Sequence, residues 1–173
     1  TFLARWTLGA IDWKPHRSAD GRAMLWVRPL DSLEAQPLAG TQDASSPFWS
    51  ADSRYLGFFA DGKLKTIEAS GGPPISLCDA PTPRGGTWNQ DDVILFTPGL
   101  NAPLYRVSAS GGIAMPVTTL DSSKGEVTHR WPQFLPDGRH FLYLAGASIS
   151  LRQSPDAILV GSLDSKERKL LIH

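Results

Sequence analysis

The fold of this chain is decided by residues 47–59, which read PFWSADSRYLGFF. An aromatic anchor is followed by a short polar turn, and the turn leads into a run of apolar residues. The pattern returns at residues 88–96 (WNQDDVILF) and at residues 134–144 (FLPDGRHFLYL). The aromatic anchors of the three stretches stand 39 and 46 residues apart. A repeat of roughly 40 residues that consists of short strands is typical of propeller blades, so we predict an all-β propeller with four-stranded antiparallel blades.

We divide the single predicted domain, residues 1–173, into three full blades and one partial blade. Glycine and proline punctuate the chain about every ten residues, as short strands and tight turns require, and no amphipathic helix is found. The first unit lacks most of a strand, and the last contains an insertion between residues 146 and 156. The predicted blades are residues 1–40 (incomplete), 45–78, 86–119 and 130–171.

Aromatic and acidic residues recur at matching positions of the full units. We expect the aromatic ring of each first strand to pack between neighbouring blades, and the acidic side chain to close the following turn by hydrogen bonding to the backbone. The apolar second strand should be buried on both faces, because it reads as a continuous apolar run. Trp131 is interpreted as a packing residue in the same way. The predicted structural anchors are Trp49, Asp52, Trp88, Asp91, Phe134 and Asp137.

These repeats resemble the bacterial WD-like (TolB-type) β-propeller repeat. The likeness is carried by residues 48–54 (FWSADSR), by residues 133–139 (QFLPDGR) and by the Ser-Gly-Gly turns at 70–72 and 110–112. The family consensus is close to Pro-x-Trp-Ser-Pro-Asp-Gly, then an apolar strand, then Gly-Gly before the last strand. The resemblance covers about residues 25–171.

In detail the chain is most similar to the propeller regions that accompany bacterial serine/threonine protein kinases. That resemblance implies an accessory interaction or sensor region. The chain itself carries no kinase catalytic motif: His129-Arg130-Trp131 lacks the aspartate of a kinase catalytic loop, and no glycine-rich nucleotide loop is found. Ala51 stands where the consensus has proline, and residues 90–92 (QDD) replace Pro-Asp-Gly.

Composition excludes several classes of partner. Lys plus Arg and Asp plus Glu both number 17, so the formal net charge is zero, which argues against a nucleic-acid partner. No apolar run approaches the ~20 residues of a membrane span. Cys78 is the sole cysteine, so no intrachain disulfide forms, and we expect it to be a small buried hydrophobe.

One group of polar residues is predicted to line the central channel. Arg84, His129 and Arg130 fall at or before the innermost strands, where their side chains would bind an anion or a carboxylate. The alternative is that they form hydrogen bonds between blades. The four histidines show no metal-ligand spacing, so we predict no metal and no cofactor.

Three functions are compatible with these residues. The first is a non-catalytic interaction or sensor module that binds a protein or peptide. The second is a hydrolytic enzyme with a site in the channel or at a subunit junction. The third is a propeller that binds a small ligand or carbohydrate, suggested by the six tryptophans. The fold does not decide among them.

An arc of fewer than four complete blades leaves sheet faces and edges exposed. Three arrangements would cover them: a larger ring of which this chain is a piece, a ring closed by copies of the chain, or a compact four-bladed ring completed by residues 1–40. We favour self-association, and therefore predict a homo-oligomer.

Overall fold

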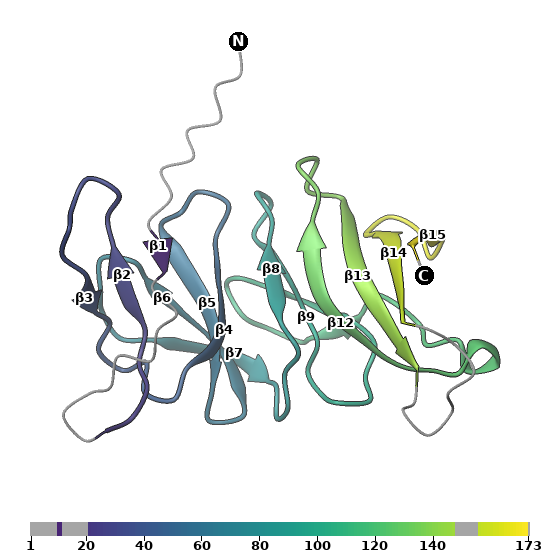
Figure 1. Cartoon of the computed structure of the whole chain (residues 1–173), viewed down its shortest axis with the longest axis horizontal. Helices are drawn as coiled ribbons and strands as arrows, with labels where there is room; N and C mark the ends of the chain where they lie inside the picture. Colours follow the sequence, from purple (N-terminus) through teal and green to yellow (C-terminus); the bar gives the residue numbers. More distant parts are fainter. Residues whose placement is uncertain (1–9, 12–20, 148–155, 173) are drawn as a thin grey trace, which may run out of the picture.

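The computed structural model describes residues 10–11, 21–147 and 156–172. It confirms the all-β fold, with four antiparallel sheets side by side in an open row (Figure 1). Three sheets have four strands and the first has three among these residues, as predicted for three full blades and a partial fourth. The helical content of the described residues is a single 3-10 turn, η1 (Ser122–Lys124), and none of their helices is long and apolar enough to cross a membrane.

Within each sheet the strands follow one another in chain order. The first sheet consists of β1 (Ala10–Ile11), β2 (Trp26–Arg28) and β3 (Gln36–Pro37). The second sheet consists of β4 (Ser45–Trp49), β5 (Tyr55–Ala60), β6 (Lys63–Glu68) and β7 (Ile75–Asp79). The third sheet consists of β8 (Gly86–Trp88), β9 (Val93–Phe96), β10 (Tyr105–Ser108) and β11 (Met115–Pro116). The last sheet consists of β12 (Glu126–Phe134), β13 (His140–Ala147), β14 (Ala157–Ser162) and β15 (Lys169–Ile172).

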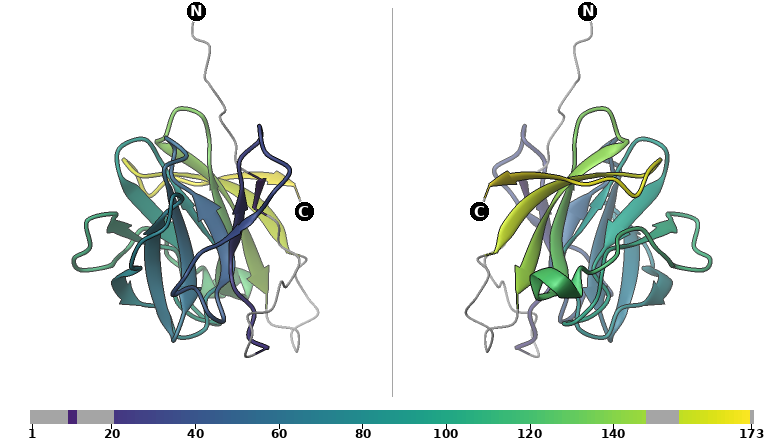
Figure 2. Two further views of the ribbon diagram at one scale, coloured as in Figure 1. Left: turned by 90° about the vertical axis from the view of Figure 1, so that its left-hand side faces the viewer. Right: turned by 90° about the vertical axis from the view of Figure 1, so that its right-hand side faces the viewer.

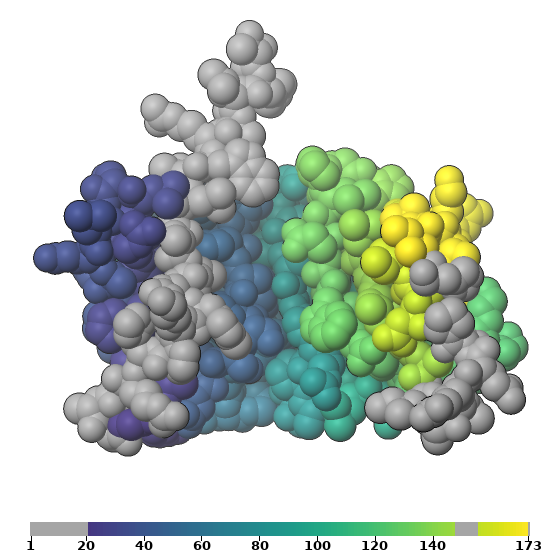
Figure 3. Space-filling view, in the orientation of Figure 1, coloured from purple at the N-terminus to yellow at the C-terminus, as the bar shows by residue number. Residues whose placement is uncertain are grey.

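The sheets form a row rather than a closed ring. In the space-filling view they make consecutive bands in sequence order (Figure 3). The first and last sheets lie at opposite ends of this row, so the chain is not a compact four-bladed ring (Figures 1 and 2). Strand β8 lies between β4 and β12, so these first strands of three sheets share one edge, which we call the axial edge. The predicted insertion and most of residues 1–24 fall outside the described residues.

Apolar layers between the sheets form the core. In β5, Leu56 and Phe58 face the first sheet, whereas Phe59 faces the third sheet. The middle strand of an inner sheet is therefore buried on both faces, as its continuous apolar sequence predicted. Burial of each such side chain contributes about 1.5–3 kcal/mol. Strand β13 alternates instead, because the outer face of the last sheet has no further sheet against it among the described residues.

The aromatic anchors lie in or against these layers. Trp88 is 8% exposed and packs between the second and third sheets, and Phe134 packs between the third and last sheets. Trp49 is partly buried against the layer between the first and second sheets. Each anchor therefore contacts the sheet that precedes its own.

The turns of the repeat are stabilised by backbone conformation and by aspartate side chains. Asp61 and Gly62, with φ of 54° and 69°, adopt the left-handed conformations that a type I′ hairpin turn requires. Asp52 Oδ1 accepts a hydrogen bond from the Arg54 amide at 3.0 Å, and Asp137 Oδ1 accepts one from Arg139 at 2.9 Å. Both aspartates thus close their turns through the backbone.

In the third sheet this role belongs to Asn89 rather than to Asp91, which is exposed. Asn89 Oδ1 accepts hydrogen bonds from the amides of Asp91 (3.0 Å) and Val93 (2.9 Å). Its Nδ2 donates to the carbonyl of Gly138 at 2.8 Å, in the matching turn of the last sheet. The turn before β9 is one residue shorter than its counterparts, so the earlier position is the one that reaches the amides.

We expect Asn89→Ala to lower the free energy of unfolding by about 2–3 kcal/mol, because three hydrogen bonds of a buried amide are lost and the Gly138 carbonyl stays buried without its donor. Asp91→Ala, two positions further on, should change it by less than about 0.5 kcal/mol. Urea unfolding measures both, and equal losses in the two variants would contradict the assignment of the turn to Asn89.

Candidate functional site

The first strands of the second, third and last sheets share an irregularity at the axial edge. Three residues before each aromatic anchor, the backbone is left-handed: φ is 47° at Ser46, 90° at Gly85 and 53° at Trp131. The pairing register of β4 and of β12 shifts at this point, as it does at a β-bulge. The repeat therefore imposes a positive φ on whichever residue stands there.

Trp131 stands out on this edge because it is bulky, left-handed and 57% exposed. Its indole lies against the backbone of Gly85, and its ring centroid is 4.9 Å from the guanidinium carbon of Arg130. The interpretation of Trp131 as a packing residue is therefore wrong. The bulge in β12 turns its side chain out of the apolar layer and leaves much of the ring in solvent.

Arg84 contacts Trp131 through its backbone, whereas Arg130 contacts it through its side chain. The Arg84 carbonyl accepts a hydrogen bond from the Trp131 amide at 2.8 Å, and the Arg84 side chain is exposed. Arg84 forms no ion pair with any residue of the described ranges. Arg130, by contrast, pairs with Asp156 at 2.8 Å. Two of the three predicted channel residues are therefore brought together, with a tryptophan between them.

His129, the third predicted channel residue, lies elsewhere. It is fully buried, and its ring lies 4.8 Å from that of Tyr143. His129 and Arg130 point to opposite faces of the last sheet, since their cross-strand partners are Ala145 and Leu144. The side chain of His129 consequently faces the third sheet and not the axial edge.

A buried hydrogen-bond network holds the His129 ring. Thr118 Oγ1 accepts a hydrogen bond from the Leu104 amide (2.9 Å) and lies 2.7 Å from His129 Nδ1. The ionised Glu126 carboxylate can only accept, so the ring proton is assigned to Nε2, and Nδ1 of the neutral ring accepts a hydrogen bond from the Thr118 hydroxyl. Nε2 lies 3.1 Å from Glu126 Oε2 and donates to it. Burial lowers the pKa of His129, although Glu126 opposes this effect, so the ring is held neutral.

Glu126 joins this network to the surface. Its carboxylate accepts two hydrogen bonds from Arg168 Nη1, at 2.8 and 2.7 Å, and one from the Asp121 amide at 2.8 Å. Burial acts to raise the pKa of Glu126, but these hydrogen bonds and that of His129 outweigh it, and the pKa is lowered. Arg168 also pairs with Asp121 at 2.9 Å, so one guanidinium binds two carboxylates.

Other candidate groups are less suited to chemistry. Burial raises the pKa of Cys78 to about 11, which keeps the thiol protonated at neutral pH. In the ranges that the structure describes, no three His, Cys, Asp or Glu side chains are grouped so that they would hold a metal ion.

The comparisons with known proteins define the fold. No family model matches the chain, and no curated protein matches it in sequence. Solved structures do match. A TolB from Agrobacterium tumefaciens gives a TM-score of 0.70 at 14% identity over 89% of this chain and 58% of its own, and TolB from Acinetobacter baumannii gives 0.67 at 14% over 87% and 38%.

A nidogen/laminin complex gives a TM-score of 0.65 at 13% identity, with 86% of this chain and 58% of that chain covered. An oligogalacturonate lyase is also among the matched structures. The chain thus has a TolB-like β-propeller fold and spans about half the length of these structures. Because binding proteins and enzymes share the fold, the fold alone decides no function.

The structure thus adds Trp131 to the residues that sequence reasoning singled out. The signal was present in the repeat. Trp131-Pro132 occupies the position of Ser46-Pro47, three residues before the anchor, and a large aromatic in place of a small residue breaks the pattern.

The pKa of His129 leads to a pH prediction. In the unfolded chain the ring titrates near its ordinary value of 6.5, whereas in the folded chain it titrates lower. Below about pH 6.5 the unfolded state therefore binds more protons, and the free energy of unfolding falls as the pH falls. Glu126 adds a similar loss only below its ordinary value of 4.5.

We expect His129→Gln to flatten the pH dependence of stability between pH 6.5 and 5, measured by urea unfolding at fixed ionic strength. The groups that act on His129 are Thr118, Glu126, Tyr143 and the charge of Arg168, and all four stay in the variant. Identical slopes for the wild type and the variant would show that His129 is not the titrating group.

Proposed function

We propose that the chain is a non-catalytic β-propeller module that binds a protein or peptide at the axial edge, with Trp131 as the anchor. The observation that carries this proposal is an exposed tryptophan with a left-handed backbone, flanked by Arg84 and Arg130. Tryptophan and arginine are the residue types that dominate the binding energy of protein interfaces.

The backbone of Trp131 argues that its side chain is kept for binding. A left-handed conformation costs a non-glycine residue about 1–2 kcal/mol, and bulky residues rarely adopt it. The two matching positions hold Ser46 and Gly85, so the fold does not require an aromatic there. More than half of the Trp131 surface is exposed, so burial of this side chain contributes little stabilisation to offset the strain. Strain of this kind concentrates at binding sites.

The charges on the axial edge suit a carboxylate-bearing segment. The Arg84 guanidinium is exposed and has no acidic partner among the described residues, so it is available to a ligand carboxylate. Arg130 is held against the indole while it pairs with Asp156, which fixes the orientation of the ring. Enclosure of His129 removes the imidazole of the three predicted channel residues from this edge. An imidazole is the group that most often serves as a general base, so its absence favours binding over hydrolysis.

We further propose that copies of the chain associate through the outer face of the last sheet. Phe59 and Leu95 face the following sheet in the second and third sheets, and both are buried. Their counterparts in β13, Leu142 and Leu144, are only partly buried. The cross-strand partners of these two leucines extend the apolar face with Ile158, Val160 and, through Ile158, Ile172.

The repeat-level resemblance to kinase-associated propellers adds a context for this module. In that context the arc serves as the sensor or interaction region beside a serine/threonine kinase domain. Its axial edge receives the partner, and its open end receives another sheet, either of a second copy or of a larger propeller.

The axial site is tested by Trp131→Gly, which places at this position the residue that the third sheet has there. We expect the free energy of unfolding to stay within about 1 kcal/mol of wild type, because relief of the left-handed strain offsets the lost contacts. Trp88→Gly, the matched control in the core, should cost more than about 3 kcal/mol.

Binding is measured with peptides selected on the wild-type chain from a random displayed library. Their affinity should fall about tenfold or more in Trp131→Gly and stay unchanged in Ile113→Gly, which alters a 90% exposed residue of a distant turn. Selected peptides that bind Trp131→Gly as tightly as wild type would refute the axial site.

Self-association is tested by light scattering across a tenfold dilution. We expect a mass above the 18.8 kDa of the single chain, and Ile158→Lys should shift the species towards that value because a charge enters the apolar face. Ile113→Lys makes the same change on an exposed turn and should have no effect. A wild-type chain that is monomeric at every concentration contradicts the homo-oligomer and favours a larger propeller.

A further inference from the structure

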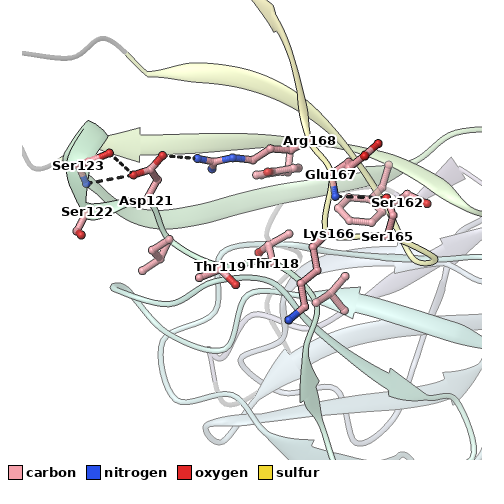
Figure 4. Close-up of a pocket in the computed structure, with 15 residues that line it drawn as sticks. Thr118, Thr119, Asp121, Ser122, Ser123, Ser162, Ser165, Lys166, Glu167 and Arg168 are labelled. Carbon is pink, nitrogen blue, oxygen red and sulfur yellow. Dashed lines mark hydrogen bonds and ion pairs between the residues drawn. The ribbon is translucent and has the colours of Figure 1, made fainter.

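A pocket of about 440 Å³ opens between the third and last sheets (Figure 4), and no residue of the axial edge lines it. One wall is the segment 117–123, which leads from β11 towards β12. The opposite wall is the hairpin 162–168 that joins β14 to β15. Phe141, Tyr143 and Gly161 form the floor. The volume is within the range of small-molecule sites.

Arg168 fixes the distance between the two walls. It belongs to the hairpin and donates across the pocket to Asp121 at 2.9 Å, as Figure 4 shows, and to Glu126 behind it. The buried Glu126 is in turn held by His129. The walls are therefore tied by a charged network before any ligand arrives, which lowers the ordering cost of binding.

The groups left over in this pocket are mainly hydrogen-bond donors. Ser162 Oγ and Ser165 Oγ each accept a hydrogen bond from a backbone amide, of Asp164 and Glu167 respectively, so their hydroxyl protons stay free to donate. Lys166 extends past Thr118 and Thr119 in Figure 4 and forms no ion pair with any described residue. Its ammonium is thus the cation of the lining that has no ion pair with these residues, beside the neutralised Arg168. Glu167 also lines the pocket without an ion pair in the described ranges, but its side chain extends away from that of Lys166 (Figure 4).

Tyr143 supplies a second, independent sign of a ligand. The side chain is 2% exposed and lines the pocket beside Arg168, and its hydroxyl proton has no acceptor within the described part of the chain, because a guanidinium can only donate. A buried hydroxyl proton without an acceptor costs about 1–3 kcal/mol. Burial raises the pKa of Tyr143 although Arg168 acts to lower it, so the hydroxyl keeps its proton and is a donor.

We propose that this pocket binds a small hydroxylated organic acid, whose carboxylate pairs with Lys166 and whose hydroxyl oxygens accept hydrogen bonds from Ser162, Ser165 and Tyr143. The surplus of donors selects an acceptor-rich ligand, and the single unpaired cation selects one negative charge. The site lies between sheets on the periphery, so it is separate from the axial edge and does not depend on the function proposed for Trp131.

The probes are D-gluconate, which combines one carboxylate with several hydroxyls, and D-glucose, its neutral counterpart. Titration of the full chain is followed by calorimetry at constant ionic strength. We expect saturable binding of gluconate and binding of glucose at least about tenfold weaker. Acetate, which has the charge without the hydroxyls, should also bind more weakly than gluconate.

Lys166→Gln should weaken gluconate binding about tenfold or more while it leaves the unfolding temperature unchanged. Lys169→Gln is the matched control, because Lys169 is exposed on β15 and faces away from the pocket beside Val160. Tyr143→Phe removes only the hydroxyl, so it should weaken gluconate binding several-fold without loss of stability.

Each outcome decides the proposal. Absence of saturable gluconate binding, equal binding of gluconate and glucose, or full affinity in Lys166→Gln overturns the site. Full affinity in Tyr143→Phe overturns the contact assigned to Tyr143. A loss in Lys169→Gln equal to that in Lys166→Gln shows non-specific attraction of the anion and also overturns the site.

Discussion

Apolar contact between the faces of neighbouring sheets holds this molecule together, because the strands of one sheet pair only with one another. Each inner sheet places apolar side chains of its middle strand on both faces, as Phe58 and Phe59 do in β5. A sheet built in this way needs a neighbour on each side. The last sheet has one neighbour among the described residues, so Leu142 and Leu144 are left partly exposed. The same two-sided apolar pattern that stabilises the interior therefore leaves an apolar face exposed at the end of the row.

Polar ties make the boundary between the third and last sheets different from the others. Asn89 bonds to the carbonyl of Gly138 near one end of the boundary, and Arg168 binds Asp121 and Glu126 near the other. Hydrogen bonds have directions that apolar contacts lack, so they fix how the two sheets lie against each other. This fixed spacing is what leaves a pocket open beside an otherwise close-packed layer.

The same left-handed bulge recurs along the axial edge, but the residue that occupies it differs from sheet to sheet. The bulge serves the architecture wherever it occurs, and small residues meet it at Ser46 and Gly85. At Trp131 the same bulge carries an aromatic side chain away from the core and beside two arginines. The left-handed backbone of Trp131 is strained, and its exposed ring gains little packing energy. This combination is expected where a residue serves binding rather than stability.

The sequence by itself determined the architecture, because the spacing of aromatic anchors, polar turns and apolar strands is a local property that repeats along the chain. It also indicated that Arg84 and Arg130 fall beside the first strands of neighbouring sheets, and the structure joins the Arg84 carbonyl to the amide of the residue after Arg130. Only the tertiary structure decided which side chains face the axial edge. A bulge reverses the alternation that a sequence pattern assumes, so Trp131 is exposed while His129 is enclosed. A turn shorter by one residue likewise moved the hydrogen bonds from Asp91 to Asn89, and the pocket arises where two distant segments meet across a pair of sheets.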